Sequence, residues 1–128
     1  VMGYSGQISQ VFINLIVNAL DAIELSEQTI DNPMIMLSTE ILDEEWVTIK
    51  VLDNGPGIPE AVCPHIFENF YTTKPDGVGT GMGLAIVHEI ITKNHHGRIL
   101  FRSDTSWGTE FEIRLPICLS PTSEFKFE

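Results

Sequence analysis

The stretch Ser5-Gly-Gln-Ile-Ser-Gln-Val-Phe-Ile-Asn-Leu-Ile-Val-Asn-Ala-Leu-Asp-Ala-Ile23 carries the strongest structural signal in the chain. Its apolar residues recur at spacings of three and four positions: Ile8, Val11, Phe12, Leu15, Ile16, Ala19, Leu20 and Ile23. Side chains three and four residues apart share one face of a helix, so the spacing predicts a helix over about residues 6–25. Ser5 is a suitable N-cap for this helix.

A strip of amide side chains runs along the same predicted helix. On a helical wheel, five polar residues fall within roughly 80° of one another: Gln7, Gln10, Asn14, Asn18 and Asp21. A solvent-facing strip usually carries Lys and Glu, so carboxamides on a mostly buried helix favour the lining of a polar cleft. A merely solvated strip is the alternative. The asparagine carbonyl oxygen is a ligand that Mg²⁺ accepts beside a polyphosphate, and Asn14 and Asn18 lie one turn apart.

The segment after this helix predicts a β-hairpin and a long connection. Residues 34–42 and 46–53 are rich in β-forming side chains and are separated by an acidic turn. Residues 54–80 are rich in Gly, Pro, Asn and Thr, with one short helical patch at about 60–68. A connection of this length inside a compact domain is usually functional or mobile.

The C-terminal half predicts a second helix and a second hairpin. The helix covers about residues 82–95, with Gly97 as its C-terminal cap. Residues 98–103 and 109–116 alternate apolar and polar side chains around a turn. The order of elements predicts an α+β fold: a two-layer α/β sandwich with helices on one face of a mixed, mostly antiparallel sheet.

Length, charge and cysteine content limit the classes of function. A chain of 128 residues suffices for one domain, which we assign to residues 1–116, with 117–128 as a tail. The net charge is −11, and residues 1–49 contain no Lys or Arg, so a nucleic-acid partner is not expected. Cys63 and Cys118 lack the spacing of a zinc site or a disulfide framework. No apolar run reaches the roughly 18 residues of a membrane span.

Asp53 is the polar residue that stands out in the first hairpin. It shares the apolar face of its strand with Val47, Ile49 and Val51, and a buried carboxylate needs a hydrogen-bond donor. The exocyclic amine of adenine is such a donor, whereas guanine presents a carbonyl oxygen at that position. The alternative is a turn with a capping aspartate at Asp53-Asn-Gly-Pro-Gly57.

The glycine-rich stretch before the second helix is the candidate phosphate site. Glycine occupies positions 77, 79, 81 and 83, and backbone amides beside a helix start can bind phosphate. Lys74, Thr72 and Thr73 lie just before this stretch and can reach phosphate oxygens. A flexible loop and a solvated lysine are the simpler alternatives, because the stretch matches neither a dinucleotide fingerprint nor a P-loop.

Taken in order, these elements resemble the catalytic ATP-binding domain of bacterial sensor histidine kinases, within the GHKL superfamily (Bergerat fold). The wording Asn18-Ala-Leu-Asp-Ala22 and Phe70-Tyr-Thr-Thr-Lys74 looks most like the nitrogen-regulation type. Five motifs covering about residues 7–116 carry the resemblance: an N box (10–22), a first glycine box (53–58), an F box (66–74), a second glycine box (79–84) and Gly108-Thr-Glu-Phe111.

The resemblance implies ATP and Mg²⁺ as cofactors and gives roles to individual residues. Asn18 would ligate Mg²⁺, Asn14 and Lys74 would be catalytic, and Asp53 would hold the adenine amine. Residues 67–83 would form an ATP lid. The complete set of cofactor-binding candidates is Asn14, Asn18, Asp21, Asp53, Gly55, Gly57, Ile58, Phe67, Phe70, Thr72, Thr73, Lys74, Gly79, Thr80, Gly81, Met82, Gly83, Leu84 and Thr109.

The implied function is transfer of the γ-phosphoryl group of ATP to a histidine on a separate domain, in two-component signalling. Related chaperone, gyrase and mismatch-repair ATPases place a glutamate general base where this chain has Asn14, which favours a kinase over a hydrolase. A GHKL-type ATPase and a catalytically silent nucleotide-binding module are the alternatives.

The sequence departs from the family pattern at two places. Glu68-Asn69-Phe70 stands where members often have Glu-Pro-Phe, which predicts a looser lid, and the domain that carries the phospho-accepting histidine is absent. His88-Glu89 resembles a phospho-accepting pair, but it lies in the second helix and is interpreted as an ordinary helical pair. His95-His96 is interpreted as a polar helix end.

The expected partners are a phosphoacceptor domain, from the same or a partner chain, and a downstream response regulator. The resemblance further implies a cytoplasmic domain without direct membrane contact, monomeric in isolation and homodimeric at full length.

Overall fold

A computed structural model describes residues 3–26, 29–68 and 83–117. Its helical elements are α1 (Ser5–Glu24), the short 3₁₀ turn η1 (Cys63–His65), α2 (Gly83–Glu89) and the π-helical turn η2 (Ile90–Asn94). Its strands are β1 (Ile35–Ile41), β2 (Trp46–Asp53), β3 (Arg98–Asp104) and β4 (Gly108–Pro116). Both predicted helices and all four predicted strands are confirmed to within a few residues, because each rests on a local periodicity.

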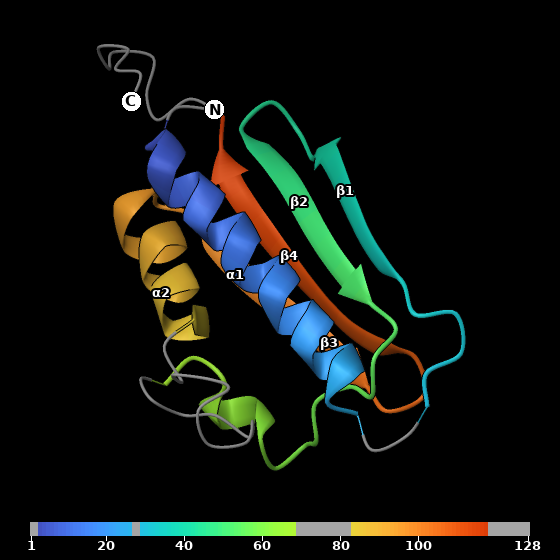
Figure 1. Ribbon diagram of the computed structural model, residues 1–128. Coiled ribbons are helices and arrows are strands. Elements are labelled where there is room, and N and C mark those ends of the chain that lie inside the picture. Colours follow the sequence, from blue (N-terminus) through green and yellow to red (C-terminus); the bar gives the residue numbers. More distant parts are fainter. Residues whose placement is uncertain (1–2, 27–28, 69–82, 118–128) are drawn as a thin grey trace, which may run out of the picture.

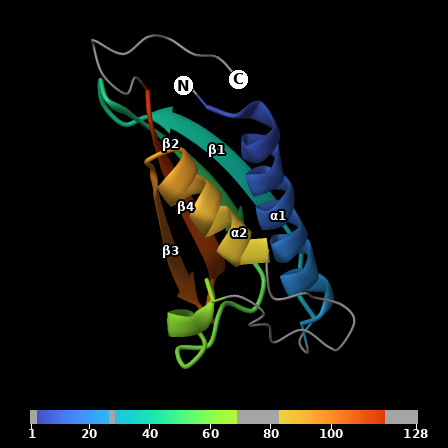
Figure 2. The same ribbon diagram turned by 90° about the vertical axis from the view of Figure 1, so that its left-hand side faces the viewer.

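The four strands form one sheet in the order β1-β2-β4-β3, and α1 and α2 cover one face of it (Figures 1 and 2). The α+β two-layer fold is therefore confirmed. All three pairings within the described residues are antiparallel, so the parallel component of the predicted mixed sheet is not found there. The physical reason is that two hairpins join through their second strands, β2 and β4.

Strand register arranges the helix-facing side chains in rows. Val51 pairs with Leu37 and Phe111, and Phe111 pairs in turn with Phe101. The next row contains Thr39, Ile49, Ile113 and Ile99. Val11 and Leu15 of α1, together with Val87, Ile90 and Ile91 from the second helical segment, cover these rows and complete the buried core.

Helix α1 is less buried than the sequence predicts. Val11, Leu15 and Ala19 are buried, whereas Ile13, Val17 and Leu20 are exposed by 44–56%. α1 packs against the sheet and, at its side, against the second helical segment, so the part of its surface that faces away from both stays exposed. Within the described residues, α1 is long enough and apolar enough, with a mean hydropathy of 1.2, to pass a length-and-composition test for a membrane span, which core helices also pass.

The ends of the two helical segments are fastened to each other. The N-cap of α1 is Tyr4, without a side-chain cap, so the prediction of Ser5 is wrong. The Tyr4 N–H instead donates to His95 Nε2 at 2.9 Å, and His95 Nδ1 lies 2.9 Å from the Ile90 carbonyl oxygen. His95 is 4% exposed, so it is a buried linking residue rather than the polar helix end that the sequence suggested. The left-handed residue after η2 is His96, with φ of 54°, not the predicted Gly97.

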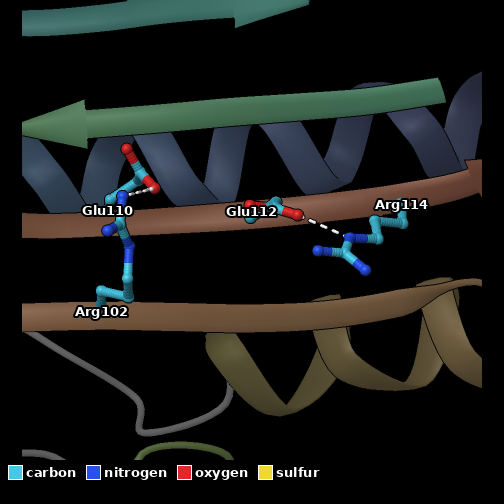
Figure 3. A network of polar contacts seen from close by, with 4 residues as sticks. All are labelled: Arg102, Glu110, Glu112 and Arg114. Carbon is cyan, nitrogen blue, oxygen red and sulfur yellow. Dashed lines mark hydrogen bonds and ion pairs between the residues drawn. The ribbon is translucent and has the colours of Figure 1, made fainter. Parts of the chain in front are cut away.

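The opposite face of the sheet is polar and carries ion pairs (Figure 3). Arg102 Nη2 lies 2.8 Å from Glu110 Oε1, and Arg114 Nε lies 2.6 Å from Glu112 Oε2. These side chains come from alternate positions of β3 and β4, which face away from the helices. The functional features described next lie on the helix-facing side.

Candidate functional site

The polar candidates that the structure describes lie toward one end of the domain, the lower end in Figure 1, where β2 and α1 end and α2 begins. At this end the apolar rows of the sheet give way to a polar row. Thr109 is paired with Asp53 on one side and with Ser103 on the other. Three adjacent strands therefore present a carboxylate and two hydroxyls side by side.

Asp53 is the buried acidic group of this row, with 4% of its surface exposed. The Gly55 N–H donates to its Oδ1 at 2.9 Å, and the Thr109 backbone N–H also hydrogen-bonds the carboxylate. Burial raises the pKa of Asp53, and these two hydrogen bonds oppose the rise. A carboxylate has about four acceptor positions, so two remain for a donor on a ligand.

The loop after Asp53 and the β3–β4 turn approach each other so closely that neither Gly57 nor Gly108 leaves room for a side chain. Gly57 has φ of 79°, and a Cβ placed on it would lie 2.6 Å from the Asp104 carbonyl oxygen. Gly108, with φ of 121°, packs directly against the Asp53 carbonyl oxygen. Both positions need the left-handed conformation and the small volume of glycine. The loop and the turn therefore form one tightly packed unit around Asp53.

The end of α1 borders this unit. A Cβ placed on Gly55 would lie 3.6 Å from the Cβ of Ala22 and 3.6 Å from Ile23 Cγ1. Asn18 and Asp21, within one turn of Ala22, are half-buried. The C-terminal end of α1, which carries the last residues of the predicted amide strip, therefore borders the loop after Asp53.

Asn14 connects α1 to the start of α2. Its Nδ2 donates to the Gly83 carbonyl oxygen at 3.2 Å, and its Oδ1 accepts from Gln10 Nε2 at 2.7 Å. Farther along the same strip, Asn94 Nδ2 donates to Gln7 Oε1 at 3.0 Å. The amide strip therefore faces the second helical segment, which a purely solvated strip would not do.

Ile58, Phe67 and Leu84 pack partly buried against the hydrophobic core. Phe67 also contacts the ring of His88, with 5.1 Å between centroids, and the ring of Phe101. The remaining candidates lie outside the described residues: Phe70, Thr72, Thr73, Lys74, Gly79, Thr80, Gly81 and Met82.

Two residues were missed from the sequence. Ser103 Oγ accepts from the Ile58 N–H at 2.7 Å, and His95 joins the helix ends. Alternation along β3 could have found Ser103, because it is a hydroxyl at a position that faces the core. His95 gave no local signal, since its partner Tyr4 is 91 residues away.

The oxygen atoms available at this site suit a hard metal ion that is bound together with an anionic ligand. Among the described residues, no three His, Cys, Asp or Glu side chains come together as a ready-made metal site. Mg²⁺ is commonly held by one or two protein oxygens plus phosphate oxygens and water. The amide oxygen of Asn18 fits that pattern, and a dedicated protein cage is not required.

Comparison with known proteins agrees with this geometry. The family described as histidine kinase-, DNA gyrase B-, and HSP90-like ATPase matches residues 3–118. Sporulation kinase A of Bacillus subtilis is 43% identical over 114 residues, which are 89% of this chain and 17% of that protein. The histidine kinase/phosphatase NtrB of Rhizobium leguminosarum is 37% identical over 119 residues, 86% of this chain and 30% of that protein.

Solved structures lead to the same family. The catalytic domain of histidine kinase ThkA superposes with a TM-score of 0.73 at 34% identity, covering 89% of this chain and 68% of that one. The mycobacterial sensor histidine kinase MprB also gives 0.73, at 26% identity, over 89% and 72% of the two chains. The chain therefore belongs to the histidine kinase-, DNA gyrase B- and HSP90-like ATPase family, and it corresponds to the catalytic domain of sensor histidine kinases.

Proposed function

We propose that this domain binds Mg²⁺-ATP and transfers its γ-phosphoryl group to a histidine on a separate domain. The observation that carries the proposal is the buried Asp53 carboxylate, which two backbone amides hold in place. It retains acceptor capacity that matches the adenine amine. Guanine would place a carbonyl oxygen against the same carboxylate and would be repelled.

The remaining proposed roles are binding of Mg²⁺, completion of the nucleotide pocket and contact with the phosphates. Asn18 is proposed to give its amide oxygen to Mg²⁺, which supplies charge neutralisation at the phosphates when bound. Asp21 and Thr109 would complete the pocket around the nucleotide. Lys74, Thr72, Thr73 and the glycines at 79, 81 and 83 are proposed to contact phosphate oxygens through side chains and backbone amides.

Asn14 is the reason to propose a kinase rather than a hydrolase. A carboxamide does not accept a proton at neutral pH, so Asn14 cannot activate water as a general base. Its contacts with Gln10 and the Gly83 carbonyl oxygen instead suit a residue that holds the start of α2 in place beside the phosphates. The phosphoryl group then remains available to an imidazole nucleophile that is brought in line.

The chain spans 12–30% of the length of the curated relatives it matches, so the parent protein's activity and partners are also proposals. We expect a phosphoacceptor-histidine domain and a downstream response regulator as partners. The proposed location is the cytoplasm, in a homodimeric protein that is either free or part of a membrane-bound sensor.

Nucleotide titration tests the binding half of the proposal. ATP and ADP should bind in the presence of Mg²⁺, and GTP should bind at least tenfold more weakly, since a lost hydrogen bond that leaves a buried group unpaired weakens binding by about this factor or more. Asp53→Ala should abolish the preference for ATP. Equal binding of ATP and GTP, or unchanged binding by Asp53→Ala, would rule out the adenine assignment.

Phosphoryl transfer tests the catalytic half. When this domain is incubated with labelled ATP and a separately supplied phosphoacceptor-histidine domain, label should appear on the acceptor only. Asn18→Ala should lose the Mg²⁺-dependent part of this phosphoryl transfer. Steady hydrolysis without any acceptor would instead indicate an ATPase. Tight ATP binding without transfer or hydrolysis would indicate a silent binding module, and label on His88 would contradict its assignment as an ordinary helical residue.

A further inference from the structure

Ser103 occupies the third position of the polar row and contacts two other segments, the loop after Asp53 and the start of β4. Its Oγ accepts from the Ile58 N–H at 2.7 Å, lies 3.1 Å from the Gly108 carbonyl oxygen, and lies 2.9 Å from Thr109 Oγ1. The Ser103 side chain thus joins the loop after Asp53 to the β3–β4 turn. Ile58 and Ser103 are 45 residues apart, so this hydroxyl makes a tertiary contact rather than a local turn.

Only one assignment of the hydroxyl hydrogens lets all three contacts be hydrogen bonds at once. A serine hydroxyl has one hydrogen and two acceptor lone pairs. The carbonyl oxygen of Gly108 can only accept, so Ser103 donates its one hydrogen there. Ser103 then accepts from both the Ile58 N–H and the Thr109 hydroxyl. The Thr109 hydrogen is thereby used, and Thr109 Oγ1 retains only lone pairs.

The direction of these bonds has a chemical consequence beside Asp53. Thr109 is the cross-strand partner of Asp53, and its backbone N–H also hydrogen-bonds the carboxylate. With its hydrogen directed to Ser103, Thr109 adds a second acceptor on the same face of the sheet as the carboxylate. Two acceptors suit the two hydrogens of the adenine amine, and they disfavour the carbonyl oxygen that guanine presents at the same position.

We propose that Ser103 is a positioning residue for base recognition: it fixes the loop of residues 53–58 and orients the Thr109 hydroxyl so that this end of the sheet accepts an amine-bearing base. The inference rests on the proposed ATP function and adds a residue to it that touches no ligand. It assigns to Ser103 both part of the nucleotide affinity and part of the preference for adenine over guanine.

The test compares Ser103→Thr with Ser103→Val, two variants of almost the same shape that differ in the hydroxyl. Binding of ATP and GTP is titrated on the full chain with Mg²⁺ present. Ser103→Val should bind ATP about tenfold more weakly than Ser103→Thr, because it loses all three hydrogen bonds of the hydroxyl and leaves the loop after Asp53 without its Ile58 contact. The ratio of ATP affinity to GTP affinity should fall in Ser103→Val and be restored in Ser103→Thr.

Ser106→Ala is the matched control, because Ser106 lies in the same turn and its Oγ bonds Asp104 Oδ1 at 2.7 Å without reaching residues 53–58. It should bind both nucleotides like the wild type. A merely structural role for Ser103 would lower the unfolding midpoint without changing the ATP-to-GTP ratio, and that result would overturn the inference. Equal ATP affinity of the Thr and Val variants would overturn it as well. Failure of the wild type to prefer ATP would instead refute the proposed function itself.

Discussion

The surroundings of Asp53 have two opposite effects on the protonation of its carboxyl group. Its burial raises its pKa and so disfavours the charged form, while the amides of Gly55 and Thr109 favour that form. A ligand amine adds a third donor to the ionised carboxylate. Nucleotide binding and protonation of Asp53 therefore compete for the same oxygens.

This competition predicts a pH dependence of stability that Asp53→Asn should remove. The folded pKa of Asp53 is raised above its ordinary value of 3.8, so between the two pKa values the folded chain holds a proton that the unfolded chain has lost. As the pH falls through this window, the wild type should gain free energy of unfolding relative to Asp53→Asn, by at most about 1.4 kcal/mol per pH unit for one proton. The gain is complete below the ordinary value and is lost as the pH rises through the folded pKa.

Urea unfolding of both proteins from pH 7 to pH 4 measures this difference, and the remaining carboxylates cancel because both proteins contain them. ATP affinity of the wild type should change in the opposite direction and weaken as the pH falls, because the neutral acid is a poorer acceptor. A stability difference that stays constant across this range would contradict the pKa argument.

The elements of the fold were predictable to different degrees. Periodicity predicted α1, β2 and β4 almost residue for residue, because it reflects neighbours along the chain. It also placed Asp53 on the core-facing side. The contacts of Ser103 and His95 depend on segments 45 and 91 residues away, which one sequence does not reveal. The exposure of Leu20, which belongs to the predicted apolar face, was missed because a helical wheel does not say how many layers surround a helix.

The connection between α1 and the end of η2 predicts a large effect of His95→Ala. The Ile90 carbonyl oxygen can only accept, so His95 donates through Nδ1 and accepts the Tyr4 N–H through Nε2. Alanine would leave two backbone groups without these partners and a void next to Gly3, whose position allows no Cβ beside the imidazole. We expect a loss of about 2–4 kcal/mol in the free energy of unfolding, since unsatisfied buried groups and cavities add.

His65→Ala is the matched control for this variant. His65 is exposed, and its contact with Glu68, 2.7 Å between Nδ1 and Oε2, is a surface pair that contributes at most about 1 kcal/mol. Chemical denaturation measures both variants, and hydrogen exchange of the Tyr4 amide should accelerate in His95→Ala alone. A His95→Ala protein as stable as the control would show that the helix ends are held by other contacts, such as Gln7 with Asn94.

At the scale of the whole molecule, charge is distributed unevenly. The chain has 18 acidic and 7 basic residues. Lys50, Arg98, Arg102 and Arg114 belong to β2, β3 and β4, at alternate positions that face away from the helices. Lys93 is the one Lys or Arg within the described helical elements, and the turn of residues 43–45 is wholly acidic. Like charges repel in the compact state more than in the expanded one, so the excess of negative charge should destabilise the fold at low ionic strength.

Added salt should therefore stabilise this domain against unfolding, and Glu44→Lys should make this stabilisation smaller. Raising NaCl from about 0.02 to about 0.2 M shortens the screening length from roughly 20 Å to below 10 Å, so the urea midpoint of the wild type should increase.

Glu44 is exposed, and Asp43 rather than Glu44 accepts the turn amides of Glu45 and Trp46, so the substitution changes the net charge without removing these hydrogen bonds. Glu44→Lys should be more stable than the wild type by on the order of 0.5 kcal/mol at low salt, the usual size of an exposed charge effect, with a smaller difference at high salt. Glu44→Gln should give about half the effect. A urea midpoint that falls with added NaCl would mean that attractive pairs such as Arg102 with Glu110, rather than the net repulsion, dominate the electrostatics of the fold.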